Sequence, residues 1–177
     1  MNKSYMTSIF RHRQLRTTVS ALAVALVIAQ LAACGPTEPP PEPHTAVTAR
    51  AVNYTDQGAE FSINHAAGGS VVAHWQSGIN CCIGIPDKWR PGLKVKVYVQ
   101  NDALWLKYKD PDRWQETELE VPPYPEPGDL YVAILPDDKV EIFSSVSGPG
   151  GTNWPFRLGH PRVECLKTRS KAACGVE

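Results

Sequence analysis

A strict alternation of apolar and polar residues over residues 93–100 constrains the fold more than any other feature of this sequence. Leu93, Val95, Val97 and Val99 are apolar, and polar or half-polar residues separate them. Successive side chains of a β-strand point to opposite faces of a sheet, so this segment predicts a strand with one buried and one solvated face. A chain organised around such strands is expected to fold as packed sheets.

Further segments favour strands as well. Residues 116–121 and 139–146 alternate, residues 130–135 form a continuous apolar run, and Pro136-Asp137-Asp138 between the last two predicts a β-hairpin. Earlier candidates are residues 45–54, 59–63 and 70–75, the last of them after Gly68-Gly69. Short strands separated by Pro- and Gly-rich turns predict a mainly β, antiparallel, sandwich-like single domain. A short helix is expected within residues 162–173.

The first 33 residues have the order of a bacterial lipoprotein signal peptide. Basic residues come first (Lys3, Arg11, Arg13 and Arg16), an apolar stretch over residues 19–29 follows, and Leu31-Ala32-Ala33-Cys34 ends it. Signal peptidases of this class need small residues before the cut and a thiol after it, so we expect Cys34 to be the lipid-bearing first residue of the mature protein. The alternative is an uncleaved membrane helix, which needs roughly 20 apolar residues, more than this run supplies.

Residues 34–44 are expected to form a Pro-rich tether, since five of residues 35–43 are proline. Gly35, where an Asp would favour retention in the inner membrane, points to the periplasm-facing leaflet of the outer membrane. Residues 45–177 then make up the β-rich domain. Residues 1–33 hold four of the 18 basic and none of the 18 acidic residues, so the mature chain has a net charge of −4. An acidic balance argues against nucleic acid as a partner.

Four cysteines besides Cys34 are disulfide candidates in the oxidising periplasm: Cys81, Cys82, Cys165 and Cys174. A bond between Cys81 and Cys82 would close an eight-membered ring, which disfavours it. We therefore slightly favour pairing of Cys81 and Cys82 with Cys165 and Cys174, which would staple the C-terminal tail to the central loop. The alternative is a local Cys165–Cys174 bond, with the adjacent pair free or mutually bonded.

A metal site is the competing interpretation, because His65, His74, Cys81 and Cys82 lie close together in the sequence. Zinc sites prefer two to four residues between paired cysteines, and adjacent cysteines fit one ion badly. We therefore predict no metal and no cofactor. Neither a Gly-x-Ser-x-Gly motif nor a phosphate-binding loop occurs, and the histidines are scattered, so we do not expect an enzyme.

The most distinctive stretch is residues 78–93, from Gly78 through Cys81-Cys82 to Pro86-Asp87-Lys88-Trp89-Arg90-Pro91-Gly92-Leu93. One interpretation is a loop that caps the core with a buried Trp89. The other is a binding loop that presents Trp89 and Arg90, since Trp and Arg are favoured at interface hot spots. Trp75, Glu116 and Glu118 complete the candidate partner-binding residues, and the alternating glutamates could form an acidic rim for a basic partner.

The adjacent cysteines followed by Pro-x-x-Trp-Arg-Pro-Gly-Leu and an alternating strand resemble a family of proteobacterial lipoproteins catalogued as domain of unknown function 3304. Residues 121–124 and 130–140 also resemble its pattern, so the resemblance covers roughly residues 45–158. It implies an immunity protein, because such genes often lie beside type VI secretion phospholipase effectors. The expected function is thus a periplasm-facing module that binds and blocks a secreted lipase. A structural or ligand-binding envelope lipoprotein is the alternative.

Overall fold

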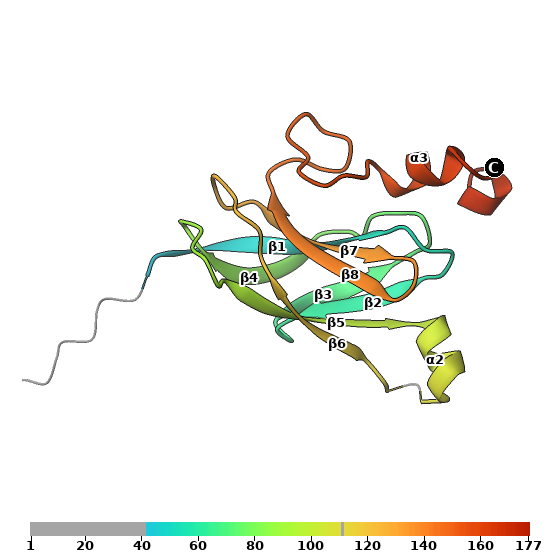
Figure 1. The fold of residues 1–177 in the computed structure, drawn as a ribbon, viewed down its shortest axis with the longest axis horizontal. Coiled ribbons are helices and arrows are strands. Elements are labelled where there is room, and N and C mark those ends of the chain that lie inside the picture. Colours follow the sequence, from blue (N-terminus) through green and yellow to red (C-terminus); the bar gives the residue numbers. More distant parts are fainter. Residues whose placement is uncertain (1–41, 111) are drawn as a thin grey trace, which may run out of the picture. The chain divides into compact units, whose positions relative to one another are not determined.

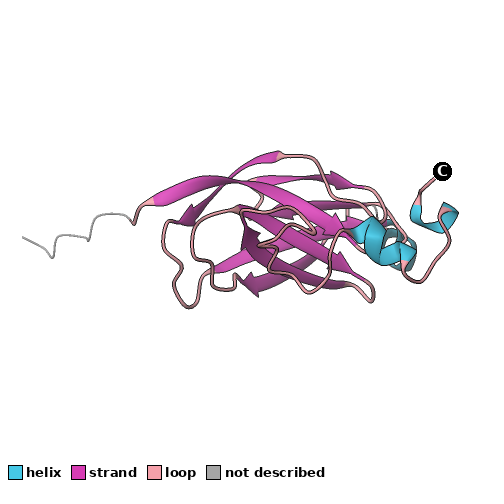
Figure 2. Cartoon of the chain, turned by 90° about the horizontal axis from the view of Figure 1, so that it is seen from above, coloured by secondary structure: helices cyan, strands magenta, loops and turns pink. Residues whose placement is uncertain are grey.

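The computed structural model describes residues 42–110 and 112–177 (Figure 1). The predicted signal peptide, Cys34 and most of the predicted tether therefore lie outside the described residues. Eight strands are described: β1 (His44–Asn53), β2 (Ala59–Ile63), β3 (Ala67–Val71), β4 (Asn80–Pro86), β5 (Lys94–Asn101), β6 (Gln115–Glu120), β7 (Asp129–Leu135) and β8 (Lys139–Ser145). The helices are α2 (Asp102–Tyr108), α3 (Pro161–Leu166) and the 3₁₀ turn η1 (Ala172–Cys174). Figure 2 shows the helices gathered at one end of the strands.

The strands form two four-stranded sheets that pack face to face. The first sheet has the order β4-β1-β7-β8 and the second β3-β2-β5-β6. All neighbours are antiparallel except β1 and β7, which run parallel with Ala49 beside Leu130. Thr48 and Arg50 both hydrogen-bond the Asp129 carboxylate, at 2.5 and 2.7 Å, and help to fix this pairing. The predicted β-sandwich-like fold is confirmed, with one parallel pair in an otherwise antiparallel arrangement.

The main core lies between the two sheets, and alternation along the strands supplies it. Val95, Val97 and Val99 of β5 point inward, while the intervening Lys94 and Lys96 are exposed. This is the pattern expected from residues 93–100. Burial of these branched apolar side chains is the main force that holds the sheets together, at about 25 cal/mol per Å² of apolar surface. The remaining buried members include Phe61, Ile63, Ala49, Ala51, Ile83, Ile85, Val121, Leu130, Val132 and Ile134.

A second apolar cluster covers the opposite face of the first sheet. Val52, Tyr54, Tyr131, Ala133, Leu135 and Phe143 point away from the main core and pack under the C-terminal segment, which contributes Trp154, Phe156 and Leu158. We call these last three residues the aromatic lid. The ring of Phe143 stacks on Phe156 at 5.0 Å between centroids and meets Trp154 edge-on at 4.9 Å. Figure 1 shows this segment on the side of the first sheet away from the second sheet.

Two strands differ from the sequence-based expectation. The strand expected at residues 70–75 lies at Ala67–Val71, so that Gly68 and Gly69 are inside it. A Cβ at Gly68 would lie 2.2 Å from the carbonyl oxygen of Phe61, so this position of the strand has room only for glycine. The adjacent cysteines lie in strand β4 at the edge of the first sheet, and the loop begins only after Pro86.

The favoured disulfide pairing was wrong. Cys165 pairs with Cys174, with a Cα–Cα distance of 5.8 Å, and Cys81 pairs with Cys82. Cys81 and Cys82 are exposed on β4, whereas Cys165 and Cys174 are buried against each other between α3 and η1. The expected terminal helix consists of these two short pieces. None of the helices in residues 42–110 and 112–177 is long and apolar enough to cross a membrane.

Candidate binding surface

Trp89 is a structural residue at the base of the central motif. Its side chain is half-buried against the main core, and its indole Nε1 donates a hydrogen bond to the carbonyl oxygen of Val121 at 2.8 Å. Arg90 is exposed and forms an ion pair with Glu42 at 3.3 Å. The structure therefore favours the core-capping interpretation for Trp89, and it leaves Arg90 on the surface close to where the described chain begins.

Trp75 belongs to a different contact, the one that attaches the C-terminal segment. Its ring meets the His160 ring edge-on at 4.7 Å, and the Arg162 guanidinium lies 3.9 Å from its centroid. Burial, and secondarily the charge of Arg162, lowers the pKa of His160. His160 also caps α3 by accepting the Arg162 backbone N–H at its Nδ1, at 3.2 Å. Trp75 and Trp89 contact different segments, so the predicted pair does not form one site.

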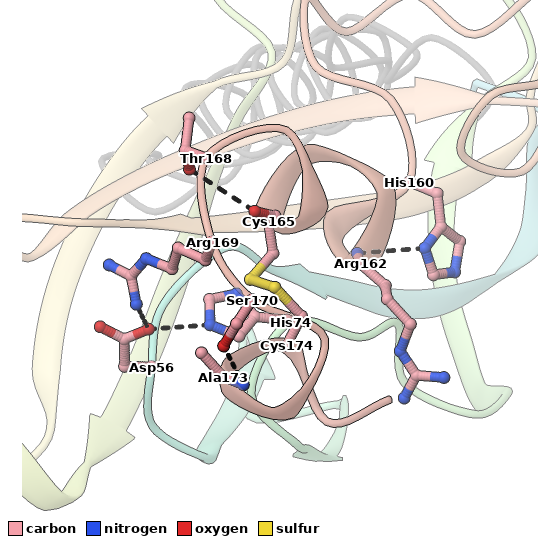
Figure 3. Close-up of a disulfide and its surroundings, with 10 residues drawn as sticks. All are labelled: Asp56, His74, His160, Arg162, Cys165, Thr168, Arg169, Ser170, Ala173 and Cys174. Atoms are coloured by element: carbon pink, nitrogen blue, oxygen red, sulfur yellow. Dashed lines mark hydrogen bonds and ion pairs between the residues drawn. A yellow bond between two sulfur atoms is a disulfide. The ribbon is translucent and has the colours of Figure 1, made fainter. Parts of the chain in front are cut away.

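The C-terminal disulfide loop is tied to the sandwich by a carboxylate (Figure 3). The Asp56 Oδ1 atom lies 2.8 Å from Nε2 of the buried His74 and also pairs with Arg169, inside the loop that the Cys165–Cys174 bond closes. Hydrogen bonds from His74, then from Arg169, hold the pKa of Asp56 below its usual range. The residues of the alternative metal site are thus engaged separately: His74 with Asp56, His65 with the ring of Tyr98, and the two cysteines with each other.

Glu116 and Glu118 share the solvent face of β6, as their spacing predicts. They do not form a free acidic rim, because lysines of β5 neutralise them. Lys96 binds Glu116 and Lys94 binds Glu118, each at 2.7 Å. The Lys94 ammonium holds the pKa of Glu118 below its usual range, and the same hydrogen bond raises the pKa of Lys94. We call this solvent face of the second sheet the open face.

An exposed cluster of aromatic and cationic residues follows β5. None of these residues was predicted from the sequence to bind a partner. Leu106, Tyr108 and Trp114 are 53%, 41% and 37% exposed, and the Arg113 guanidinium lies 3.9 Å from the Tyr108 ring centroid. Tyr108, Arg113 and Trp114 line one hollow of about 360 Å³, and we call these three residues the aromatic patch. Helix α2 positions Tyr108: Asn101 Oδ1 accepts the Leu104 N–H at 2.9 Å, and Leu104 is buried. Glu116 lines the same hollow, so one predicted residue lies beside the patch.

Two further hollows open on the open face beside the patch. One, of about 440 Å³, is lined by Glu60, Ser62, His65, Gly68, Ser70 and Trp114, among others. The other, of about 380 Å³, is lined by Glu60, Ser70, Gln100 and Asp102, among others. Glu60 and Ser70 line both of these hollows, so the two lie next to each other, and we call them together the polar groove.

This combination defines a class of protein: a β-sandwich with one face sealed by its own C-terminal segment and the other face open to solvent. The chain belongs to the family described as Protein of unknown function (DUF3304), whose profile matches residues 52–142. The match confirms the family expected from the central motif. It runs from β1 into β8 and includes α2 and Trp114, whereas the aromatic lid and the Cys165–Cys174 loop lie beyond it. No curated protein matches the chain in sequence.

Proposed function

We propose that this protein is a periplasm-facing lipoprotein that binds a protein partner, and that the partner is a type VI secretion phospholipase effector which it blocks. In this proposal Cys34 carries the lipid anchor, and the Pro-rich tether holds the sandwich away from the outer-membrane leaflet. The family resemblance supports the lipase as target. An immunity protein needs no chemistry of its own, only a surface that covers the effector.

The observation that carries the proposal is the aromatic patch. Trp, Tyr and Arg dominate the binding energy of protein interfaces, and here Tyr108, Arg113 and Trp114 lie together on the surface. A tyrosine ring under a guanidinium is a rigid surface that loses little conformational freedom on binding. The carboxylates of Glu116 and Asp138 line the same hollow and supply a polar rim.

The test is the survival of cells that produce, in the periplasm, a phospholipase effector encoded beside the gene for this protein. Co-production of this protein should restore growth, and the double variant Tyr108→Asp/Arg113→Ala should lose protection with at least about a tenfold weaker effector affinity. Val163→Asp is the matched control, because Val163 is an exposed apolar residue on α3, outside the patch. Killing that is unchanged by the wild-type protein would end the proposal.

A ligand-binding envelope lipoprotein without an inhibitor role is the second candidate function. The polar groove favours it, because an open hollow lined with hydroxyl, amide and carboxylate groups suits a small polar ligand. Binding of an effector at the aromatic patch does not require such a hollow. A pull-down from membranes that recovers only a resident envelope component, together with no protection against the lipase, would favour this candidate.

A further inference from the structure

The polar groove contains a row of side chains that crosses β3, β2 and β5 and ends at Trp114, just before β6. Ser70 of β3 is paired with Glu60 of β2, and Glu60 is paired with Gln100 of β5. Trp114 directly precedes Gln115, the first residue of β6, and lines the same hollow as Ser70 and Glu60, so it ends the row. Strands are about 4.8 Å apart, so the row is about 14 Å long, the length of a short oligosaccharide and longer than a single sugar ring.

The chemistry along this row is a flat aromatic ring at one end and planar or hydroxylic hydrogen-bonding groups along the rest. The Trp114 indole offers an apolar face against which the C–H face of a pyranose ring can pack. Ser70 offers a hydroxyl, Gln100 an amide and Glu60 a carboxylate, which accepts hydrogen bonds from neighbouring sugar hydroxyls. The Glu60 carboxylate is exposed and has no hydrogen bond or ion pair within the described residues.

The charges of the groove exclude anionic ligands. Glu60 lines both hollows of the polar groove. No lysine or arginine of the described residues lines either of them. The nearest lysines of the face, Lys94 and Lys96, are bound by Glu118 and Glu116. A phosphate, a phospholipid head group or an acidic peptide would therefore meet uncompensated negative charge. An uncharged ligand rich in hydroxyl groups would not be repelled by the Glu60 carboxylate.

The walls of the central hollow are also kept open. Gly68 has no room for a side chain, because a Cβ there would lie 2.2 Å from the Phe61 carbonyl oxygen. At the rim, the exposed ring of His65 is held against Tyr98, with 3.9 Å between centroids. Backbone and a fixed ring lose less conformational entropy when a ligand binds than long mobile side chains would.

From this row we infer that the polar groove is a binding site for an uncharged oligosaccharide of pyranose rings. Trp114 stacks on one ring, and Glu60, Gln100 and Ser70 hydrogen-bond the hydroxyl or acetamido groups of the next rings. This inference names the ligand class of the second candidate function and is independent of the lipase proposal.

The experiment is a calorimetric or NMR titration of the domain with two uncharged probes, the β-1,4-linked tetrasaccharides of N-acetylglucosamine and of glucose. At least one should bind, and Glu60→Ala and Trp114→Ala should each weaken its affinity by about tenfold or more. The tetrasaccharide that binds more tightly distinguishes an uncharged N-acetylated amino-sugar glycan from a hexose polymer. Glu118→Ala is the matched control on the same face, and its affinity should equal that of the wild type.

Retention of native near-UV circular dichroism in each variant separates loss of the site from loss of the fold. Absence of binding by both tetrasaccharides at millimolar concentration would overturn the inference, as would equal binding by wild type and both variants. Binding of an arginine-rich peptide at Glu60 and Trp114 in the absence of any sugar binding would instead identify the groove as a site for basic protein segments. The Tyr108→Asp/Arg113→Ala variant should keep sugar affinity even where it loses the effector, so the two proposals fail separately.

Discussion

The outer faces of the two sheets have opposite character. The outer face of the first sheet is apolar and is sealed by the aromatic lid, with Tyr131 and Phe143 among the residues beneath it. The open face of the second sheet carries lysine–glutamate pairs and the polar groove, and nothing in the described chain covers it apart from the local contacts of His65 and the segment after α2. One face is thus buried and contributes to stability, and the other is exposed to solvent.

The difference is visible in the strand sequences. Every residue from Leu130 to Leu135 in β7 is buried, because both faces of this strand are covered. Exposed and half-buried residues alternate in β6, because one of its faces is solvated. A continuous apolar run therefore indicates a strand between two packed layers, while alternation indicates a strand at the surface.

The substitution Phe143→Ala is expected to have the largest effect on stability. Phe143 is 5% exposed and stacks between Tyr131 and Phe156, so truncation should leave a cavity under the aromatic lid and lower the free energy of unfolding by about 3–5 kcal/mol. Urea unfolding followed by tryptophan fluorescence measures the change. Lys94→Ala on the open face is the control and should leave the urea midpoint within experimental error. Equal effects of the two substitutions would contradict the contrast between the faces.

The second-largest effect on stability is expected from loss of the Cys165–Cys174 disulfide, whose loop follows the aromatic lid. Replacement of Cys165 and Cys174 together by serine removes the cross-link of a loop with a sequence separation of 9. The entropy of an unfolded loop of this length predicts a loss of about 2–3 kcal/mol. The expected result is a lower unfolding midpoint and faster proteolysis after the lid, with the sheets still formed. A reducing agent should reproduce it in the wild type, and a double variant as stable as the wild type would show that the loop is held by its other contacts.

The smallest expected effect is a dependence of stability on pH that acts through His160. Because burial lowers its folded-state pKa below the usual 6.5, the unfolded chain binds the proton more readily below that pH. Stability should therefore fall as the pH drops below about 6.5, and stay level above it. His160→Asn keeps an acceptor for the α3 cap and removes the titrating ring, so its urea midpoint should change less between pH 7.5 and 5.5. A parallel pH response of wild type and variant would exclude His160 as the cause.

Much of the sandwich could be predicted from the sequence, because strand periodicity is a local signal. The hairpin of β7 and β8 and the alternation of β5 and β6 were correct. Helix α2 was missed, since seven residues are too few to establish a helical period. The parallel pairing of β1 with β7 was missed because no local pattern states which distant strand becomes a neighbour.

The site was harder to predict for the same reason. Trp89 and Trp75 stood out as hot-spot residue types, but in the fold each packs against another segment of the chain. Glu116 and Glu118 were placed on the correct face, and the lysines that neutralise them became apparent only from the register of β5 and β6. The density of Tyr108, Arg113 and Trp114 in one short segment was the available signal. The row from Ser70 to Trp114 depends on the pairing of β3, β2 and β5 and has no counterpart in the linear sequence.

The position of β1 has a consequence for how the molecule is made. It is the first strand in the described chain, yet it lies inside the first sheet between β4 and β7, and its contact with Asp129 joins residues 81 positions apart. This sheet cannot close while the chain is still short, because both neighbours of β1 are synthesised after it. Such non-local pairing slows folding. The first sheet therefore stays incomplete until β7, which ends at Leu135, has been synthesised.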